Sequence, residues 1–287
     1  MFNFENVKNI AYLDSPFCET AKDKFCEKYS INAYATPFMT IKQVVEYIDQ
    51  NPDNLGILPV ENSIEGTVRE TLDNLMAAKN PNLKILAENY VNIKYSLLSK
   101  TTEFYSITGI ISPPDLLAKC NEFIKNEMPF NCNIIEAASI SEAARSLQNY
   151  NLTYASLGTE KTAETFNLNI LKDNINDDQT NQTRYILIGD FETQETGNDR
   201  TSIAFSAENK PGALLNVLNI FMQNKINLSY IASYPSKNRF DEYVFIVNFE
   251  GHIRNPKIMQ TLKQIKDNTA YMRFFGSYKK SKALILT

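Results

Sequence analysis

From the start of the chain to residue 189, short apolar runs alternate with segments of helical periodicity. Residues 55–60 (LGILPV) form a continuous apolar run, which is typical of a buried parallel strand. Just before them, Val44, Val45 and Ile48 repeat at the spacing of a helix. Strands that alternate with helices form parallel sheets with right-handed crossovers. The pattern therefore predicts an α/β fold, either as one domain or as two lobes with a ligand cleft between them.

The other predicted elements of residues 7–189 follow the same alternation. Helices are expected at residues 19–29, 41–49, 64–78, 115–126, 141–149 and 159–166. Strands are expected at residues 8–13, 84–91, 93–98, 107–111, 133–136, 154–156 and 184–189.

The composition changes at Asp190, where a polar, unpatterned segment predicts a linker over residues 190–199. Beyond it, residues 200–279 predict a second domain with the order strand, helix, strand, strand, helix, strand. The expected ranges are 201–206, 212–224, 226–233, 242–249, 256–267 and 271–275. This βαββαβ order is the ferredoxin-like pattern. Pro211 is expected at the start of its first helix, where a missing N–H costs nothing.

The charge and the scarce residue types exclude several classes of function. With 29 basic and 33 acidic residues, the net charge of −4 is too close to neutral for general attraction to nucleic acid or to an anionic membrane. The chain has only 9 glycines, and its sequence contains neither the dinucleotide-binding motif G-x-G-x-x-G nor a phosphate-binding P-loop motif. A single histidine, His252, and four cysteines without a C-x-x-C pair argue against a multi-histidine metal site, a zinc ribbon or a redox motif.

The chain also carries no recognisable targeting segment. No stretch approaches the ~20 apolar residues of a membrane span. The opening MFNFENVKN lacks the basic region and apolar run of a secretory signal, so we expect a cytoplasmic protein. In that compartment Cys18, Cys26, Cys120 and Cys132 are expected to be reduced thiols.

Residues 58–75 (LPVENSIEGTVRETLDNL) place polar side chains between a predicted strand and a predicted helix. Asn62 or Ser63 fits the N-cap of that helix, and Asn62 with Glu65 fits a capping box. The N–H groups at such a helix start favour an anion. Two interpretations follow: a capped surface helix, or a substrate carboxylate at the helix end with Asn62 and Ser63 as additional donors.

Residues 181–189 (NQTRYILIG) place Thr183 and Arg184 at the N-terminal edge of an apolar strand. Arg184 can bind a carboxylate through two parallel hydrogen bonds. Thr183 offers a hydroxyl that can donate a proton or a hydrogen bond to a leaving oxygen. The alternative is that these residues only begin the strand, with Arg184 in a surface salt bridge worth less than ~1 kcal/mol.

Together, these segments resemble the prephenate dehydratase family. The family's run ENS-x-x-G-x-V followed by D-x-L is matched by Glu61, Asn62, Ser63, Gly66, Val68, Asp73 and Leu75. Its D-x-x-x-N-x-T-R-F stretch is similar to residues 173–185, with Tyr185 in place of the usual phenylalanine. Residues 139–144 and 155–159 resemble its STA-x-A and AAIGS segments. The resemblance extends over nearly the whole chain in the right order.

This resemblance implies that residues 7–189 form a two-lobed, periplasmic-binding-protein-like catalytic domain. The implied reaction converts prephenate to phenylpyruvate, water and carbon dioxide in L-phenylalanine biosynthesis, without a cofactor or a metal. Thr183 would then assist the departure of the ring hydroxyl, and Glu61 would either orient its neighbours or be held protonated. The residues that the resemblance assigns to substrate binding are Glu61, Asn62, Ser63, Arg184, Ser112 and Phe17.

Residues 200–279 resemble the ACT regulatory domain that follows the catalytic domain in this family. Its P-G-A-L turn is matched by residues 211–214, and its FEGH-like strand end by residues 249–252, which makes His252 a structural residue. In relatives this domain binds phenylalanine at a dimer interface and inhibits the enzyme. The resemblance therefore implies a homodimer or homotetramer. The effector site would comprise Gly212, Ala213, Leu214, Leu215, Ser233 and Pro235.

The chain departs from the family pattern at several positions. The opening G-P-x-G-T-F-S turn is shortened to residues 14–18 (DSPFC), which keep only Phe17 in register, and the SHPQ segment becomes residues 112–115 (SPPD). Lys119 and Tyr95 replace a frequent glutamine and a usual histidine. The ESRP motif becomes residues 232–235 (ASYP), which removes both of its charges. These changes predict weaker binding of the substrate and weaker regulation by phenylalanine.

Two alternatives to an active prephenate dehydratase stay open. A catalytically weak relative that acts as a small-molecule binding or regulatory module is favoured by the loss of the glycine-rich turn. Dehydration of arogenate is the other, because no residue identifies the group on the substrate's side-chain carbon. The presence of Thr183 and Arg184 favours the prephenate dehydratase.

Overall fold

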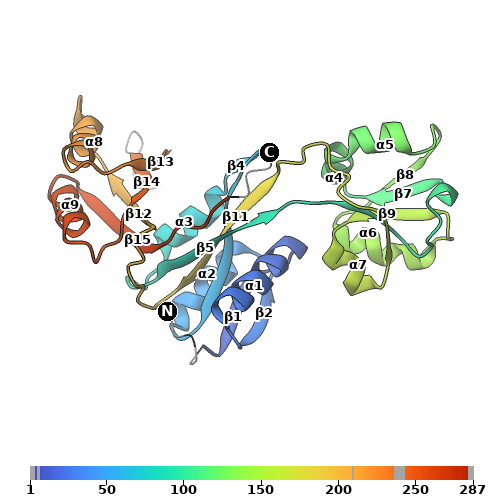
Figure 1. The fold of residues 1–287 in the computed structure, drawn as a ribbon, viewed down its shortest axis with the longest axis horizontal. Helices are drawn as coiled ribbons and strands as arrows, with labels where there is room; N and C mark the ends of the chain where they lie inside the picture. Colours follow the sequence, from blue (N-terminus) through green and yellow to red (C-terminus); the bar gives the residue numbers. More distant parts are fainter. Residues whose placement is uncertain (1–3, 5–6, 209, 236–242, 284–287) are drawn as a thin grey trace. The chain divides into compact units, whose positions relative to one another are not determined.

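The computed structural model describes residues 4, 7–208, 210–235 and 243–283 (Figure 1). The chain divides into two compact units. Among the described residues, unit 1 joins those up to residue 91 with those from residue 184 onward, and unit 2 comprises residues 92–183. The expected α/β class is confirmed, with separate sheets in the two units.

The first sheet of unit 1 has the strand order β2-β1-β3-β11-β5, with β4 paired to β3. Its strands are β1 (Asn9–Leu13), β2 (Tyr34–Phe38), β3 (Leu55–Asn62), β4 (Gly66–Thr67), β5 (Lys84–Asn92) and β11 (Gln182–Gly189). β1 is parallel to β2 and to β3, as the alternation predicts. The mostly exposed strand β2 and the two-residue β4 were not predicted because neither has a continuous run of buried apolar residues.

Three helices accompany this sheet, namely α1 (Pro16–Tyr29), α2 (Ile41–Gln50) and α3 (Arg69–Ala77). α1 begins earlier than the expected residue 19, because Ser15 caps it by accepting from the Cys18 N–H and Pro16 occupies its first turn. α2 begins with a capping box between Thr40 and Gln43.

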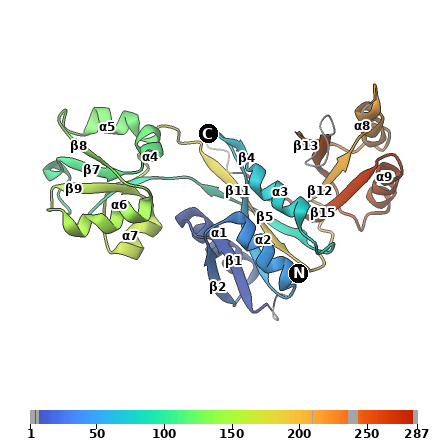
Figure 2. The same cartoon turned by 180° about the vertical axis from the view of Figure 1, so that it is seen from behind.

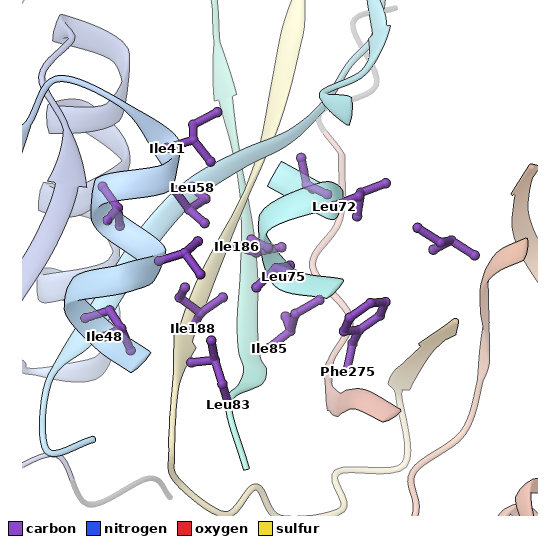
Figure 3. Packing of buried hydrophobic residues seen from close by; sticks show 14 of the residues in the cluster. Ile41, Ile48, Leu58, Leu72, Leu75, Leu83, Ile85, Ile186, Ile188 and Phe275 are labelled. Atoms are coloured by element: carbon purple, nitrogen blue, oxygen red, sulfur yellow. The ribbon is translucent and has the colours of Figure 1, made fainter. Parts of the chain in front are cut away.

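The apolar faces of these helices cover opposite sides of the sheet. α2 and α3 contribute to one buried cluster with residues of β3, β5 and β11, and Figure 3 shows Ile41 and Ile48 of α2 directed toward Leu58 and Ile188. α1 contributes Cys18, Ala21 and Phe25 to a second cluster. Burial of apolar area on both faces, worth about 25 cal/mol per Å², holds the sheet in place.

Unit 2 contains a mixed sheet with the order β10-β6-β9-β7-β8. Its strands are β6 (Ser96–Ser99), β7 (Gly109–Ser112), β8 (Asn133–Glu136), β9 (Tyr154–Gly158) and β10 (Asn169–Lys172). β7 is parallel to β8 and β9, whereas β6 is antiparallel to β9 and β10. The expectation of purely parallel pairing is therefore wrong for β6, which runs opposite to both of its neighbours, β9 and the unpredicted β10.

The helices of unit 2 are shorter than predicted. They are α4 (Pro114–Lys119), α5 (Asn121–Glu127), α6 (Ile140–Ser146) and α7 (Glu160–Phe166), with 3₁₀ turns at Phe104–Ser106 and Leu147–Asn149. The single helix expected at residues 115–126 is interrupted at Cys120, whose φ of −121° and ψ of 23° depart from helical values. Ser139 and Thr159 cap α6 and α7.

The last part of unit 1 has the expected βαββαβ order. Its elements are β12 (Asp199–Ser206), α8 (Ala213–Gln223), β13 (Leu228–Pro235), β14 (Tyr243–Glu250), α9 (Pro256–Asp267) and β15 (Tyr271–Lys279). The antiparallel sheet has the order β13-β14-β12-β15, as in ferredoxin-like domains, and Figure 2 shows α8 and α9 beside β12 and β15. Pro211 precedes α8 rather than beginning it, because Gly212 is the N-cap. Glu242, the expected start of β14, lies outside the described residues.

The segment expected to be a linker is anchored to this second sheet. Thr193 is buried, donates its hydroxyl to the carbonyl oxygen of Ser277 at 2.6 Å, and lies 3.0 Å from Nε2 of His252. Nδ1 of His252 accepts from the Arg254 N–H. Burial lowers the pKa of His252. These contacts support the structural role expected for that histidine.

The second sheet packs on the first at Gly276, where β15 crosses β5. Gly276 has a φ of +132°, which L side chains rarely adopt, and a Cβ there would overlap the carbonyl oxygen of Ile85. Phe275 and Tyr278, on either side of it, are buried in the same cluster as Leu72 and Leu75. This approach fixes the C-terminal sheet against the sheet that carries β3 and β11.

Gly276→Ala is expected to destabilise the protein by about 3 kcal/mol or more, because backbone strain and overlap with Ile85 add together. Gly197→Ala is the matched control. Gly197 also has a positive φ, of +81°, but a Cβ there meets no atom within 4 Å, so we expect about 1 kcal/mol. Denaturant unfolding of both variants measures the difference. Equal losses in the free energy of unfolding for the two variants would show that the close approach of Gly276 to Ile85 has no special importance for stability.

The four cysteines are free thiols, as expected. Burial raises the pKa of Cys18 to about 11 and that of Cys120 to about 12. Among the described residues, no helix has the length and apolar composition to cross a membrane.

Candidate active site

The polar residues that follow β3 form a hairpin turn and not a helix start. Asn62 is the last residue of β3 and pairs with Gly66 of β4. Its side-chain Oδ1 accepts from the N–H groups of Ile64 and Glu65, both at 2.9 Å. This side-chain turn offers the backbone an alternative to the helix that the sequence predicts. The predicted N-cap and capping box at Asn62 and Ser63 are therefore wrong.

α3 begins later, at Arg69, and its N-cap Val68 makes no side-chain capping bond. Gly66 has a φ of +81°, which suits the hairpin and not a helix. The carboxylate site expected at a helix end is consequently absent from the described turn. The chain forms a hairpin in place of a helix start, and this hairpin carries the polar groups of Glu61, Asn62 and Ser63.

Arg184 is buried in β11, between β3 and β5. Its Nη2 lies 3.1 Å from Oε2 of Glu61, and its Nη1 lies 3.2 Å from Oε2 of Glu88 on β5. The arginine side chain is 6% exposed, so the alternative of a surface salt bridge is wrong. The ion pair with Glu61 brings two of the predicted substrate-binding residues together and connects them to the Asn62 turn.

The surroundings of Arg184 keep it charged. Burial alone lowers the pKa of its guanidinium, but Tyr278, Glu88 and Glu61 outweigh burial and raise the pKa above its ordinary value. The two carboxylates differ in accessibility, because the Glu61 side chain is 38% exposed and the Glu88 side chain is fully buried. Glu61 is therefore the partner that a ligand carboxylate can replace.

Thr183 is the second residue of β11 and is also buried. The chain before it is fixed by hydrogen bonds within unit 2. The Asn181 carbonyl accepts from Ile93 at 2.8 Å, and the Asp173 carboxylate accepts from the Ser96 hydroxyl at 2.9 Å. The predicted catalytic hydroxyl therefore lies on a rigid strand and not on a loop.

Ser112 and Phe17 lie in other elements. Ser112 ends β7 in unit 2, is fully buried, and donates its hydroxyl to the Pro113 carbonyl at 3.3 Å. Phe17 lies in the first turn of α1 in unit 1 and packs, half-buried, against the cluster under that helix. The structure thus connects Glu61, Asn62 and Arg184 through the contacts described above. Thr183 directly precedes Arg184 on β11, whereas Phe17 and Ser112 lie on other elements.

The predicted effector turn leads into α8. Gly212 is its N-cap with a φ of +83°, and a Cβ there meets no atom within 4 Å. Ala213 and Leu214 are half-buried, and Leu215 is 58% exposed. The turn therefore presents an exposed apolar side chain beside backbone N–H groups of the first helical turn.

The predicted effector strand is the edge strand β13. Ser233 and Pro235 are exposed, whereas Tyr234 between them is buried against the first sheet. Tyr230 and Tyr234 of this strand contact residues of β4 and α3. The Tyr230 hydroxyl lies 2.6 Å from the hydroxyl of Thr67, and Arg69 stacks over Tyr234 at 6.0 Å. One face of β13 thus contacts the element that follows the Asn62 turn.

Glu88, which joins Arg184 to the C-terminal sheet, was not predicted from the sequence. Its Oε2 also accepts from Nη1 of Arg200 at 2.5 Å. A signal was available, since Glu88 is a lone acid inside the apolar strand ILAENYV. Buried carboxylates of that kind require a charged or hydrogen-bonding partner. In the described ranges, no group of three or more His, Cys, Asp or Glu side chains is placed to hold a metal ion.

Comparison with protein families gives two consecutive matches. The prephenate dehydratase model matches residues 14–193, and the ACT domain model matches residues 201–267. A prephenate dehydratase from Methanocaldococcus jannaschii is 34% identical over 268 residues, which cover 91% of this chain and 94% of the relative. A bifunctional chorismate mutase/prephenate dehydratase from Aquifex aeolicus is 32% identical over 280 residues, which cover 97% of this chain and 75% of the relative.

A solved structure agrees with these matches. The prephenate dehydratase from Arthrobacter aurescens, in complex with L-Phe, superposes with a TM-score of 0.81 at 25% identity. The superposition covers 97% of this chain and 93% of that chain. Both matched segments are therefore included in one similar fold.

Proposed function

The chain belongs to the prephenate dehydratase family, and from that premise we propose that it converts prephenate to phenylpyruvate, water and carbon dioxide. The observation that carries the proposal is the buried Arg184, paired with Glu61 at the start of the Asn62 turn. These residues lie in the segment that the family model matches. The proposed enzyme is a carbon–oxygen lyase of L-phenylalanine biosynthesis.

The proposed reaction needs little chemistry from the protein. The bond between the ring and its carboxylate breaks, and its electron pair completes the aromatic ring as the ring hydroxyl leaves with a proton as water. Aromatisation supplies the driving force. The protein must hold a dianion, assist the departing hydroxyl, and leave the carboxylate that becomes carbon dioxide without a strong ion pair.

We propose that Arg184 binds the substrate carboxylate that is retained in the product, phenylpyruvate. A planar guanidinium can bind a carboxylate through two parallel hydrogen bonds. Glu61 is half-exposed and holds Arg184 from the accessible side, so the substrate carboxylate replaces Glu61 while Glu88 keeps the arginine in place. In this proposal Glu61 orients Arg184 before substrate arrives, and Asn62 and Ser63 donate from the turn. Ser112 and Phe17 are proposed as further substrate contacts.

We propose that Thr183 assists the departure of the ring hydroxyl. Its hydroxyl acts as a proton donor or hydrogen-bonding partner in the transition state. Its position on β11, directly before Arg184, makes the two residues neighbours along the chain.

For the domain boundaries we propose a catalytic domain at residues 7–189, a linker at 190–199 and an ACT domain at 200–279. The end of β11 at Gly189, the start of β12 at Asp199 and the end of β15 at Lys279 support these limits. ACT domains commonly pair, so we propose a homodimer or homotetramer.

Purified protein incubated with prephenate tests the function directly, because phenylpyruvate is measured by its absorbance in alkali. Parallel incubation with arogenate distinguishes the two dehydratases, since arogenate yields phenylalanine instead. Absence of both products at micromolar enzyme would favour a binding or regulatory module.

We also propose phenylalanine as an effector, at a site formed by Gly212, Ala213, Leu214, Leu215, Ser233 and Pro235. Support comes from the relative solved with L-Phe and from the turn at Gly212. The edge strand has alanine and a buried tyrosine where ESRP has charges, so we expect binding about tenfold weaker than in relatives with the full motif.

Calorimetry with phenylalanine, together with an inhibition curve, measures this difference. Tight binding with steep inhibition would show that the two charges are dispensable here. Absence of binding at millimolar phenylalanine would leave the domain with a role in assembly alone.

A further inference from the structure

One fully buried carboxylate, that of Glu88, connects the candidate active site to the ACT domain. Its Oε2 accepts from Nη1 of Arg184 at 3.2 Å and from Nη1 of Arg200 at 2.5 Å. Its Oε1 accepts from the N–H of Ser281 at 3.0 Å. Arg200 lies on the first strand of the ACT domain, and Ser281 follows the last one. Both ends of that domain therefore meet at the group that holds Arg184.

The shared oxygen makes the two arginines dependent on each other. A buried carboxylate is costly unless it is paired, and Glu88 is paired twice. Together, Arg184, Glu88 and Arg200 carry a net charge of about +1, which Glu61 balances in the structure and a ligand carboxylate balances when it replaces Glu61. Without Arg200 the pair of Arg184 and Glu88 is neutral, and Glu88 holds Arg184 alone.

The ACT domain also offers a continuous path from the effector turn to Arg200. β12 carries Arg200 at one end and Ile203 and Phe205 further along. Ile203 and Phe205 pack in one buried cluster with Val217 and Phe221 of α8, the helix that the Gly212 turn begins. α8 and β12 are therefore in direct packing contact.

We propose that Glu88 is a positioning residue for Arg184, and that Arg200 is the group through which the ACT domain changes substrate binding. The proposal rests on the proposed function and adds a regulatory contact to the same site. A stronger pairing of Arg200 with Glu88 releases Arg184 toward the substrate, and a weaker pairing returns Arg184 to Glu88. Phenylalanine then acts by its different affinity for these two arrangements.

Arg200→Gln tests this proposal by removing the charge and leaving the rest of β12 unchanged. We expect KM for prephenate to rise about tenfold while kcat stays within about twofold, because binding and not chemistry is affected. We also expect the change that phenylalanine causes in KM to fall to less than half of its wild-type size, while calorimetry still detects phenylalanine binding. Arg200→Lys keeps a cation and should restore KM to within about threefold of wild type.

Arg273→Gln is the matched control. Arg273 crosses the same packing surface, on β15, and donates to the carbonyl oxygens of Met76, Ala78 and Asn80 at 2.9, 2.8 and 3.2 Å. It contacts no candidate substrate residue in these bonds, so KM and its response to phenylalanine should stay near wild type. Arg200→Met, which keeps the apolar stem, replaces Arg200→Gln if the glutamine variant does not fold.

The outcomes separate the two levels of the proposal. If wild-type protein gives no phenylpyruvate, the proposed function fails, and if it does not bind phenylalanine, the proposed effector site fails. If wild-type protein does both and the folded, charge-removing Arg200 variant keeps the full response of KM to phenylalanine, the role of Glu88 and Arg200 is overturned. If Arg273→Gln loses as much of the response of KM to phenylalanine as the Arg200 variant does, the role of Glu88 and Arg200 is also overturned. The response would then depend on domain packing in general.

Discussion

Thr183→Ala should lower turnover of prephenate by about 100-fold or more, because a positioned proton donor contributes roughly that factor. KM should change far less, since the hydroxyl acts mainly in the transition state. Thr183 is buried in β11, so denaturant unfolding of the variant must accompany the kinetics to separate lost turnover from lost folding. Steady-state kinetics with the alkaline absorbance of phenylpyruvate measure both constants.

Thr183→Ser is the matched control for this variant, because it keeps the hydroxyl and removes only the methyl group. We expect it to retain turnover within about tenfold of wild type. A Thr183→Ala variant with near-normal turnover would exclude Thr183 as the group that assists the leaving hydroxyl. Equal losses in both variants would indicate a packing role for the methyl group instead.

The regular elements of the fold were predictable where hydrophobic periodicity was strong. LGILPV became β3, and the spacing of Val44, Val45 and Ile48 became the buried face of α2. The βαββαβ order after Asp190 was also confirmed. β2 and β10 were missed because they lie at sheet edges with many exposed residues, which removes the apolar signal.

The candidate site was predictable in its residue types but not in its local structure. Asn62 has the same sequence signature as a helix cap, yet its side chain closes a hairpin turn at 2.9 Å from two N–H groups. Both structures satisfy backbone donors with one side-chain oxygen, so the local sequence did not distinguish them. Gly66, with its φ of +81°, was the residue that favoured the turn.

Glu88 shows a different limit of prediction from sequence. Its partners Arg184 and Arg200 lie far away along the chain and meet it only because β5 neighbours β11 and the C-terminal sheet packs nearby. A lone acid in an apolar strand indicates that a partner exists, but the strand order that identifies the partner comes from the three-dimensional fold.

Arg184 is the residue for which this geometry predicts the second large effect. Arg184→Gln should raise KM for prephenate by about 100-fold, because one charge-assisted bidentate contact is lost. Arg184→Lys should raise KM by about tenfold, since an ammonium keeps the charge but cannot reproduce the planar two-donor grip. kcat should fall less than KM rises in both variants, because the contact is made in the ground state as well as in the transition state.

Loss of Arg184 should also affect stability, because the carboxylates of Glu61 and Glu88 both pair with it. With glutamine at position 184, Glu61 loses its cation and Glu88 keeps only Arg200 and Ser281, so the free energy of unfolding should also fall by about 2 kcal/mol or more. Lys280→Gln is the control, because its ion pair with Glu250 is solvent-exposed and should contribute little. Kinetics and denaturant unfolding measured on the same preparations separate the two effects. Unchanged KM in both Arg184 variants, with the loss confined to unfolding, would make Arg184 a purely structural cation and would move the carboxylate grip to the Asn62 turn.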